Sequence, residues 1–269
     1  MKQIAKSRKA IHALINLLED EDKQVSVAAM ERLLSYDKDV DKIIAEFQES
    51  SSPTLRGRIH QLGNVVNLKR SRSKFIDDVL SSTISLWDGV LQINYQFNPI
   101  MDLHEVRKAF QSLQDRLPKT LTITDLVDFM INEEFTFTSE DILGADLYLV
   151  EDVLLQRVGA PILLSVIFCK LAKSRKLSTS IVISNGRHCV HYGKESYLIN
   201  TSDNWQITKV DKATKIHHCK KIEIWITILC QLFISAIVDG QFQNIHKIGS
   251  MLSVLCGEDL EKLPFPLGK

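Results

Sequence analysis

The chain has 269 residues, of which 45% are hydrophobic and 25% are charged, a composition typical of a folded globular protein with a sizeable core. Lysine plus arginine and aspartate plus glutamate both number 33, so net charge does not favour binding to nucleic acid or to an anionic membrane. The five cysteines are dispersed and form no C-x-x-C pair, which argues against a disulfide framework and for a reducing cytoplasm.

Residues 1–74 have the pattern of short amphipathic helices joined by polar turns. Apolar residues recur at helical spacing around Leu14, Leu33 and Ile43, and Pro53 is suited to open a further helix. Helices that each bury an apolar stripe on the next predict a HEAT-like arm. The basic run at 69–74 suggests either a phosphate-binding patch or a solvated linker face, and we favour the linker face because no aromatic residues interleave with the run for base stacking. The charged N-terminus has no apolar segment behind it, so we expect no secretory signal.

The middle of the chain changes from helical to strand-like patterning. Helical periodicity continues over 76–134, and another helix is expected around Leu147–Leu154. An apolar-faced helix is predicted from Pro161 to Lys176, followed by three strands at 180–184, 187–192 and 196–200. Short strands after one central helix indicate an antiparallel sheet packed on helices, so the predicted fold class is α+β and predominantly helical.

Two more helices are expected at the end of the chain, at 222–238 and 241–256, joined as a hairpin by Asp239-Gly240. The apolar stretch from Ile224 to Val238 is shorter than the roughly 20 residues that a helix needs to cross a bilayer. We therefore predict a buried core helix and no membrane association.

A series of short motifs runs from Asp146 to Asn200. In chain order they are Tyr148-Leu149, Val153-Leu154, Arg157, Gly159-Ala160-Pro161-Ile162-Leu163-Leu164-Ser165, Asn185-Gly186-Arg187-His188 and Leu198-Ile199-Asn200-Thr201. The series resembles the bacterial SirB family of transglutaminase-like proteins. Its sharpest element is Arg157-x-Gly159-x-Pro161 followed by His188, and the upstream Trp87-Asp88-Gly89 and the C-terminal hairpin also fit that family's layout.

The resemblance implies a transglutaminase-like (papain-like) core over 75–215, between the HEAT-like arm and a tetratricopeptide-like hairpin over 216–269. It also implies a nucleophile at the start of the central helix, where the helix dipole would stabilise an anion, with His188 on the next strand. Asn200 takes the place of the residue that orients the imidazole. We therefore expect His188 and Asn200 to approach within hydrogen-bonding distance on adjacent strands.

The nucleophile of that arrangement is missing from this chain. Pro161 and Leu163 occupy the start of the predicted helix, and no cysteine lies there. Ser165 is the nearest hydroxyl, but it lies about one turn inside the helix, where hydroxyls usually bond back to a carbonyl. We interpret Cys169, about two turns in, as a buried filler of the core. His188 and Asn200 are then vestigial catalytic residues.

Two histidine- and cysteine-rich segments suggest zinc, namely His188-Cys189-x-His191 and His217-His218-Cys219. Neighbours on a strand face opposite sides, so Cys189 cannot pair directly with His188 and at most two ligands of the first segment converge. Structural zinc takes four ligands. We therefore expect no metal site and no cofactor.

The sequence favours a transglutaminase-like pseudoenzyme that acts as a cytoplasmic protein-interaction or regulatory module. Its partner would be a protein, bound through the groove of the core or through the helical arms, since repeat-like helices present extended binding surfaces. The alternative is a residual amide hydrolase or acyl transferase that uses His188 with a nearby serine or cysteine. A third interpretation is a subunit whose helical arms only mediate oligomerisation.

Overall fold

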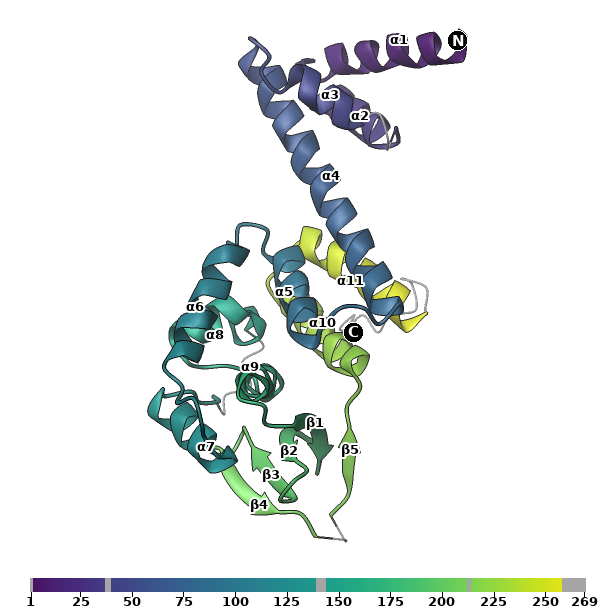
Figure 1. Cartoon of the computed structure of the whole chain (residues 1–269). Coiled ribbons are helices and arrows are strands. Elements are labelled where there is room, and N and C mark those ends of the chain that lie inside the picture. Colours follow the sequence, from purple (N-terminus) through teal and green to yellow (C-terminus); the bar gives the residue numbers. More distant parts are fainter. Residues whose placement is uncertain (1, 37–39, 139–143, 212–213, 258–269) are drawn as a thin grey trace. The chain divides into compact units, whose positions relative to one another are not determined.

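The computed structural model describes residues 2–36, 40–138, 144–211 and 214–257. The protein is mostly helical and has one small antiparallel sheet, in agreement with the predicted α+β class (Figure 1). Its contacts divide the chain into two compact units, Met1–Lys74 and Phe75–Lys269, and each unit has a hydrophobic core of its own.

The first unit is a set of helices that bury their apolar stripes on one another. The helices are α1 (Lys2–Leu17), α2 (Lys23–Leu34), α3 (Val40–Phe47) and the first part of α4 (Pro53–Leu80). The most deeply buried residues of its core include Ile15, Leu33 and Ile59. The Asp22 side chain caps α2 by accepting a hydrogen bond of 2.8 Å from the Gln24 amide.

Helix α4 is continuous through the basic run at 69–74, which is exposed or half-buried and ends at the boundary between the two units. No proline or glycine follows Gly63 before the helix ends at Leu80, and nothing else in that segment would break a helix. Arg70 of the run forms an ion pair of 2.7 Å with Asp41 of α3. Beyond the run, Phe75 is buried in the core of the second unit.

The second unit contains the remaining helices. They are α5 (Leu86–Phe97), α6 (Leu103–Asp115), α7 (Ile123–Asn132), the 3-10 turn η1 (Ala145–Tyr148), α8 (Val150–Gln156), α9 (Pro161–Ser174), α10 (Lys221–Val238) and α11 (Phe242–Cys256). Side-chain caps fix where the first three begin: Ser85 caps α5, Asp102 caps α6, and Thr122 forms a capping box with Asp125 at α7.

The single helix expected around Leu147–Leu154 is two elements, η1 and α8, and a distant side chain explains the break. Asn94 of α5 is fully buried, and its Nδ2 donates a hydrogen bond of 3.0 Å to the Tyr148 carbonyl. Its Oδ1 accepts one of 2.7 Å from the Val150 amide. The two bonds satisfy backbone groups that a continuous helix would have paired internally.

The sheet has five antiparallel strands in the order β4-β3-β2-β1-β5. The strands are β1 (Thr179–Ser184), β2 (Arg187–Tyr192), β3 (Tyr197–Asn200), β4 (Gln206–Lys209) and β5 (Ile216–His218). The hairpin from β1 to β2 turns at Asn185-Gly186, where both residues have positive φ, 49° and 77°. Helix α9 packs on β1 and β2, and Val182, Cys189 and Leu198 form a small cluster on the opposite face.

The C-terminal hairpin of α10 and α11 packs on the rest of the second unit mainly through α5 and η1. A Cβ atom added to Gly89 would lie 2.5 Å from the indole of Trp225, so only glycine allows this contact. The Trp225 Nε1 donates a hydrogen bond of 3.1 Å to the Leu86 carbonyl. By length and composition α10 would be able to cross a membrane, but Ile224, Trp225 and its other buried residues lie in the core. The predicted boundary between the transglutaminase-like core and the C-terminal hairpin, at residue 215, lies just before β5.

Candidate functional site at the start of helix α9

The motif Arg157-x-Gly159-x-Pro161 directs the chain into α9. Arg157 ends α8 in the left-handed conformation, with φ 64°. A Cβ atom on Gly159 would lie 2.8 Å from a methyl group of Val153, so this close approach requires glycine. Thr136 holds the segment by two backbone bonds, donating to the Arg157 carbonyl at 2.9 Å and accepting from the Gly159 amide at 3.1 Å.

The side chain of Arg157 also has a structural role. Its guanidinium lies 3.5 Å from the Glu133 carboxylate and 4.7 Å from the centroid of the Phe135 ring. Arg116 binds the same carboxylate through two hydrogen bonds. The basic residue of the motif therefore anchors the turn before α9 to the end of α7.

The first turn of α9 carries no nucleophilic side chain. Pro161 is its first residue, and Ile162 and Leu163 are buried in the core. Ser165 is fully buried, and its hydroxyl donates a hydrogen bond of 2.7 Å to the Pro161 carbonyl. This is the bond to the carbonyl four residues earlier that was expected for a hydroxyl inside a helix. The Ser165 hydroxyl proton therefore points along the helix rather than toward an imidazole.

His188 lies on the face of β2 that packs against α9. It is paired with Ile183 of β1, and Val190, two residues further along the strand, belongs to the main core. Burial lowers the pKa of the His188 imidazole below its usual value, so the ring is neutral at pH 7. Within the described part of the chain, the ring makes no hydrogen bond.

Asn200 lies on the opposite face of the sheet, so the prediction that it approaches His188 is wrong. The register pairs Val190 with Ile199, and one residue further it brings Asn200 opposite Cys189. The Cys189 thiol accordingly points at Asn200 Oδ1, with sulfur and oxygen 4.0 Å apart. The same oxygen accepts hydrogen bonds from the backbone and side chain of Ser202, which stabilise the turn after β3.

Thr201 takes the place beside His188 that the resemblance had given to Asn200. It is buried, and its hydroxyl lies 3.1 Å from the Pro161 carbonyl and 3.4 Å from the Ser165 hydroxyl. The His188 carbonyl is 3.4 Å away. The candidate site is thus a buried cluster of hydroxyl groups and carbonyls. Strand alternation in the sequence places Asn200 and Thr201 on opposite faces, but it does not say which of the two faces α9.

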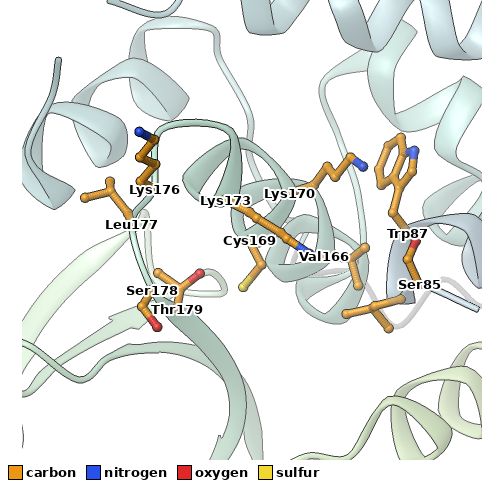
Figure 2. Close-up of a pocket in the computed structure, with 11 residues that line it drawn as sticks. Ser85, Trp87, Val166, Cys169, Lys170, Lys173, Lys176, Leu177, Ser178 and Thr179 are labelled. Atoms are coloured by element: carbon orange, nitrogen blue, oxygen red, sulfur yellow. The ribbon is translucent and has the colours of Figure 1, made fainter. Parts of the chain in front are cut away.

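A pocket of about 450 Å³ lies at the other end of α9 (Figure 2). Its lining residues come from α9, from the start of α5 and from the segment entering β1: Ser85, Leu86, Trp87, Val166, Cys169, Lys170, Lys173, Lys176, Leu177, Ser178 and Thr179. Among the described residues, three lysines and no carboxylate line it. Lys170 lies beside Trp87 in the view, with its ammonium 5.8 Å from the indole. The spacing of the lysines at every third residue was visible in the sequence.

Cys169 contributes its sulfur to this pocket rather than to the start of α9. Burial raises the pKa of the Cys169 thiol to about 12, and a hydrogen bond with Thr179 offsets only part of that effect. Such a thiol is protonated at neutral pH and is a poor nucleophile. Cys169, expected as a buried filler of the core, is half-buried, packs against the core and lines the pocket.

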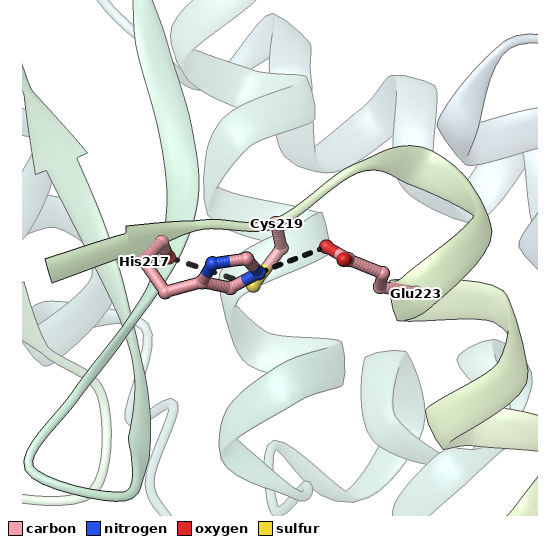
Figure 3. A group of neighbouring side chains, drawn as sticks. All are labelled: His217, Cys219 and Glu223. Atoms are coloured by element: carbon pink, nitrogen blue, oxygen red, sulfur yellow. Dashed lines mark hydrogen bonds and ion pairs between the residues drawn. The ribbon is translucent and has the colours of Figure 1, made fainter.

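The side chains of each histidine- and cysteine-rich segment lie on both faces of the sheet. His188 faces α9, whereas His191 lies on the opposite face, where its ring centroid is 5.3 Å from that of His218. His217 and Cys219 point to the other side of β5 from His218, and Glu223 joins them (Figure 3). Neither of the two segments that suggested zinc in the sequence includes Glu223, although it follows Cys219 by only four residues.

The central part of the chain matches a known family. Residues 101–225 match the family model described as Transglutaminase-like superfamily, so they form a transglutaminase-like domain. The domain runs from just before α6 to the first turn of α10 and contains α9, the whole sheet and the cluster around Ser165 and Thr201. No curated protein and no solved structure gives a significant match to the chain.

Proposed function

We propose that this chain is a non-catalytic transglutaminase-like protein of the SirB type that acts as a protein-interaction or regulatory module. The observation that carries the proposal is the composition of the first turn of α9. Pro161, Ile162 and Leu163 provide no nucleophilic atom, and the hydroxyl of Ser165 is used in a bond to the Pro161 carbonyl. Acyl transfer needs a nucleophile about 3.5 Å from the scissile carbonyl and a base within about 3.2 Å of the nucleophile.

The remaining polar groups do not supply the missing roles of a residual hydrolase. Asn200, on the far face of the sheet, does not orient the His188 imidazole. The thiol of Cys189 lies on that far face too, and burial raises its pKa. Cys169 is protonated at neutral pH in its pocket. These separations favour a binding role over turnover.

The pocket beside α9 supplies a surface for such a role. Lys170, Lys173 and Lys176 concentrate positive charge around a cavity whose wall includes Trp87. A cavity lined by one sign of charge attracts the opposite charge, and the apolar lining favours an aliphatic stem. We infer that the partner is a protein that presents an acidic side chain to this pocket.

Activity assays test the non-catalytic assignment. Purified full-length protein is assayed for amine incorporation into casein and for release of amide substrates, beside His188→Ala. We expect background rates from both proteins, because the loss of a covalent nucleophile costs orders of magnitude in rate. Turnover above background that disappears in His188→Ala would overturn the assignment.

The partner is tested by affinity purification from the native host with three baits: the full chain, Lys173→Glu and Lys194→Glu. Lys194 is exposed in the turn between β2 and β3, away from the residues that line the pocket, and controls for the change in net charge. We expect one set of proteins to be captured by the full chain and by Lys194→Glu, and to be lost with Lys173→Glu. Equal capture by all three baits would exclude the pocket as the docking site. A fourth bait without residues 1–74 shows whether the first unit contributes.

A further inference from the structure

The end of the sheet holds a group of three metal-ligating side chains that lies apart from the cluster at α9. His217 is on β5, Cys219 follows it by two residues, and Glu223 lies in the first turn of α10. Alternation along an extended segment puts His217 and Cys219 on the same side. The chain then turns into α10, which brings the Glu223 carboxylate back toward both (Figure 3).

A helix cap holds Glu223 in this place. Its Oε2 accepts a hydrogen bond of 2.6 Å from the Lys220 amide, the return bond of a capping box. The same oxygen lies 3.2 Å from His217 Nε2. Within the described residues, the other carboxylate oxygen, Oε1, takes no part in these bonds and is available to coordinate an ion.

We propose that His217, Cys219 and Glu223 form a binding site for one divalent ion of the zinc class. An imidazole nitrogen, a thiolate and a carboxylate oxygen are the three donor types that Zn²⁺ takes in proteins. Tetrahedral zinc, with bonds of about 2.0–2.3 Å, separates its ligand atoms by roughly 3.3–3.8 Å. The three donor atoms here lie within 4.8 Å of one another, so small side-chain rotations bring them to that spacing.

The three ligands come from a segment of seven residues, His217 to Glu223, so the site needs no contact from elsewhere in the fold. The neighbouring pair His191 and His218 does not complete the set, because it lies on the opposite face of the sheet. Three protein ligands leave a fourth position for water or for a donor from another molecule. The ion would join the edge strand β5 to the start of α10.

The test is a titration of the chelator-treated full-length protein with Zn²⁺ and, for spectroscopy, with Co²⁺. We expect one equivalent to bind, with a thiolate-to-cobalt charge-transfer band and the strong visible absorption of tetrahedral Co²⁺. His217→Ala and Cys219→Ser should each weaken binding by more than about tenfold, since even indirect support of a ligand is worth that much. Cys219→Ser should also remove the charge-transfer band.

Two controls separate this site from incidental binding. His218→Ala removes the adjacent imidazole, which faces the other side of the sheet, and Cys256→Ser removes an exposed thiol on α11. Both controls should bind as tightly as the unchanged protein. Absence of binding, or binding that survives both His217→Ala and Cys219→Ser, would overturn the proposal and leave His217 and Glu223 as an ordinary exposed ion pair. Loss of binding in Cys256→Ser would likewise contradict it.

Discussion

The His188 imidazole is half-buried against the core, and this changes how it binds protons. Burial lowers its pKa from the ordinary value of 6.5. We predict that proton NMR of the His188 ring will show a titration midpoint below 6.5. The His188→Gln variant identifies the resonance by removing it. A midpoint at or above 6.5 would show that a carboxylate or water supports the charged ring.

The same shift predicts that stability falls in mild acid. The unfolded chain takes up a proton on His188 as the pH falls through about 6.5, whereas the folded chain does so only at lower pH. The free energy of unfolding contributed by this residue is therefore present above about pH 6.5 and is lost below it. Urea denaturation at pH 7.5 and 5.5 should show a smaller loss for His188→Gln than for the unchanged protein. His104→Gln, on the exposed side of α6, is the matched control; equal losses in all three proteins would contradict the prediction.

The orientation of individual side chains was the feature least predictable from the sequence. His188 and Asn200 lie on the adjacent strands β2 and β3, as expected, but the faces of their side chains depend on strand register. A shift of one residue exchanges the two faces of a strand. The pairing of Val190 with Ile199 therefore turns Asn200 away and turns Thr201 toward Pro161. No single-residue pattern in the sequence specifies this register.

Among the elements, the segment from η1 to α8 depends on one distant side chain. The buried Asn94 side chain hydrogen-bonds two backbone groups, the Tyr148 carbonyl and the Val150 amide. In Asn94→Ala we expect the free energy of unfolding to fall by about 1–3 kcal/mol for each buried group left without a partner. Asn132→Ala, at an exposed position in the last turn of α7, should change it by less than about 0.5 kcal/mol. Chemical denaturation measures both, and similar effects of the two variants would show that the Asn94 bonds are not buried.

Most helices were predictable because their apolar residues recur at helical spacing and their first residues are good caps, as at Ser85 and Asp102. The two outer strands were not. β4 and β5 are short and largely exposed, so they lack the alternation of buried and exposed residues that indicates a strand. The break between η1 and α8 was not predictable either, since Asn94 lies 54 residues before Tyr148.

At the scale of the whole molecule, each of the two units has its own core, although α4 runs through both. We predict that Ile59→Ala, in the first core, will speed amide hydrogen exchange over 9–66 and leave 75–257 protected. Ile59 is fully buried, and removing such a side chain costs about 2–5 kcal/mol. Hydrogen exchange with mass spectrometry distinguishes the two regions. Equal acceleration in both would mean that they open as one cooperative unit.

The reverse experiment uses the C-terminal end of α4. Phe75 is buried and its ring lies 6.4 Å from that of Trp225, in an edge-on contact. Phe75→Ala should lower the free energy of unfolding of the second unit by about 3–5 kcal/mol. Leu80→Ala, at the exposed end of the same helix, is the matched control and should have little effect. A Phe75→Ala protein as stable as Leu80→Ala would show that this end of α4 does not belong to the second core.

The proposed non-catalytic function requires that the transglutaminase-like domain contain no activated nucleophile. The most direct measurement is peptide mapping by mass spectrometry after treatment of the full-length protein with iodoacetamide and with a fluorophosphonate. We predict that the exposed Cys256 reacts fastest, that Cys169 reacts slowly because its pKa is about 12, and that Ser165 stays unmodified. Rapid labelling of Ser165 or Cys169 that is lost in His188→Ala would contradict the proposed function.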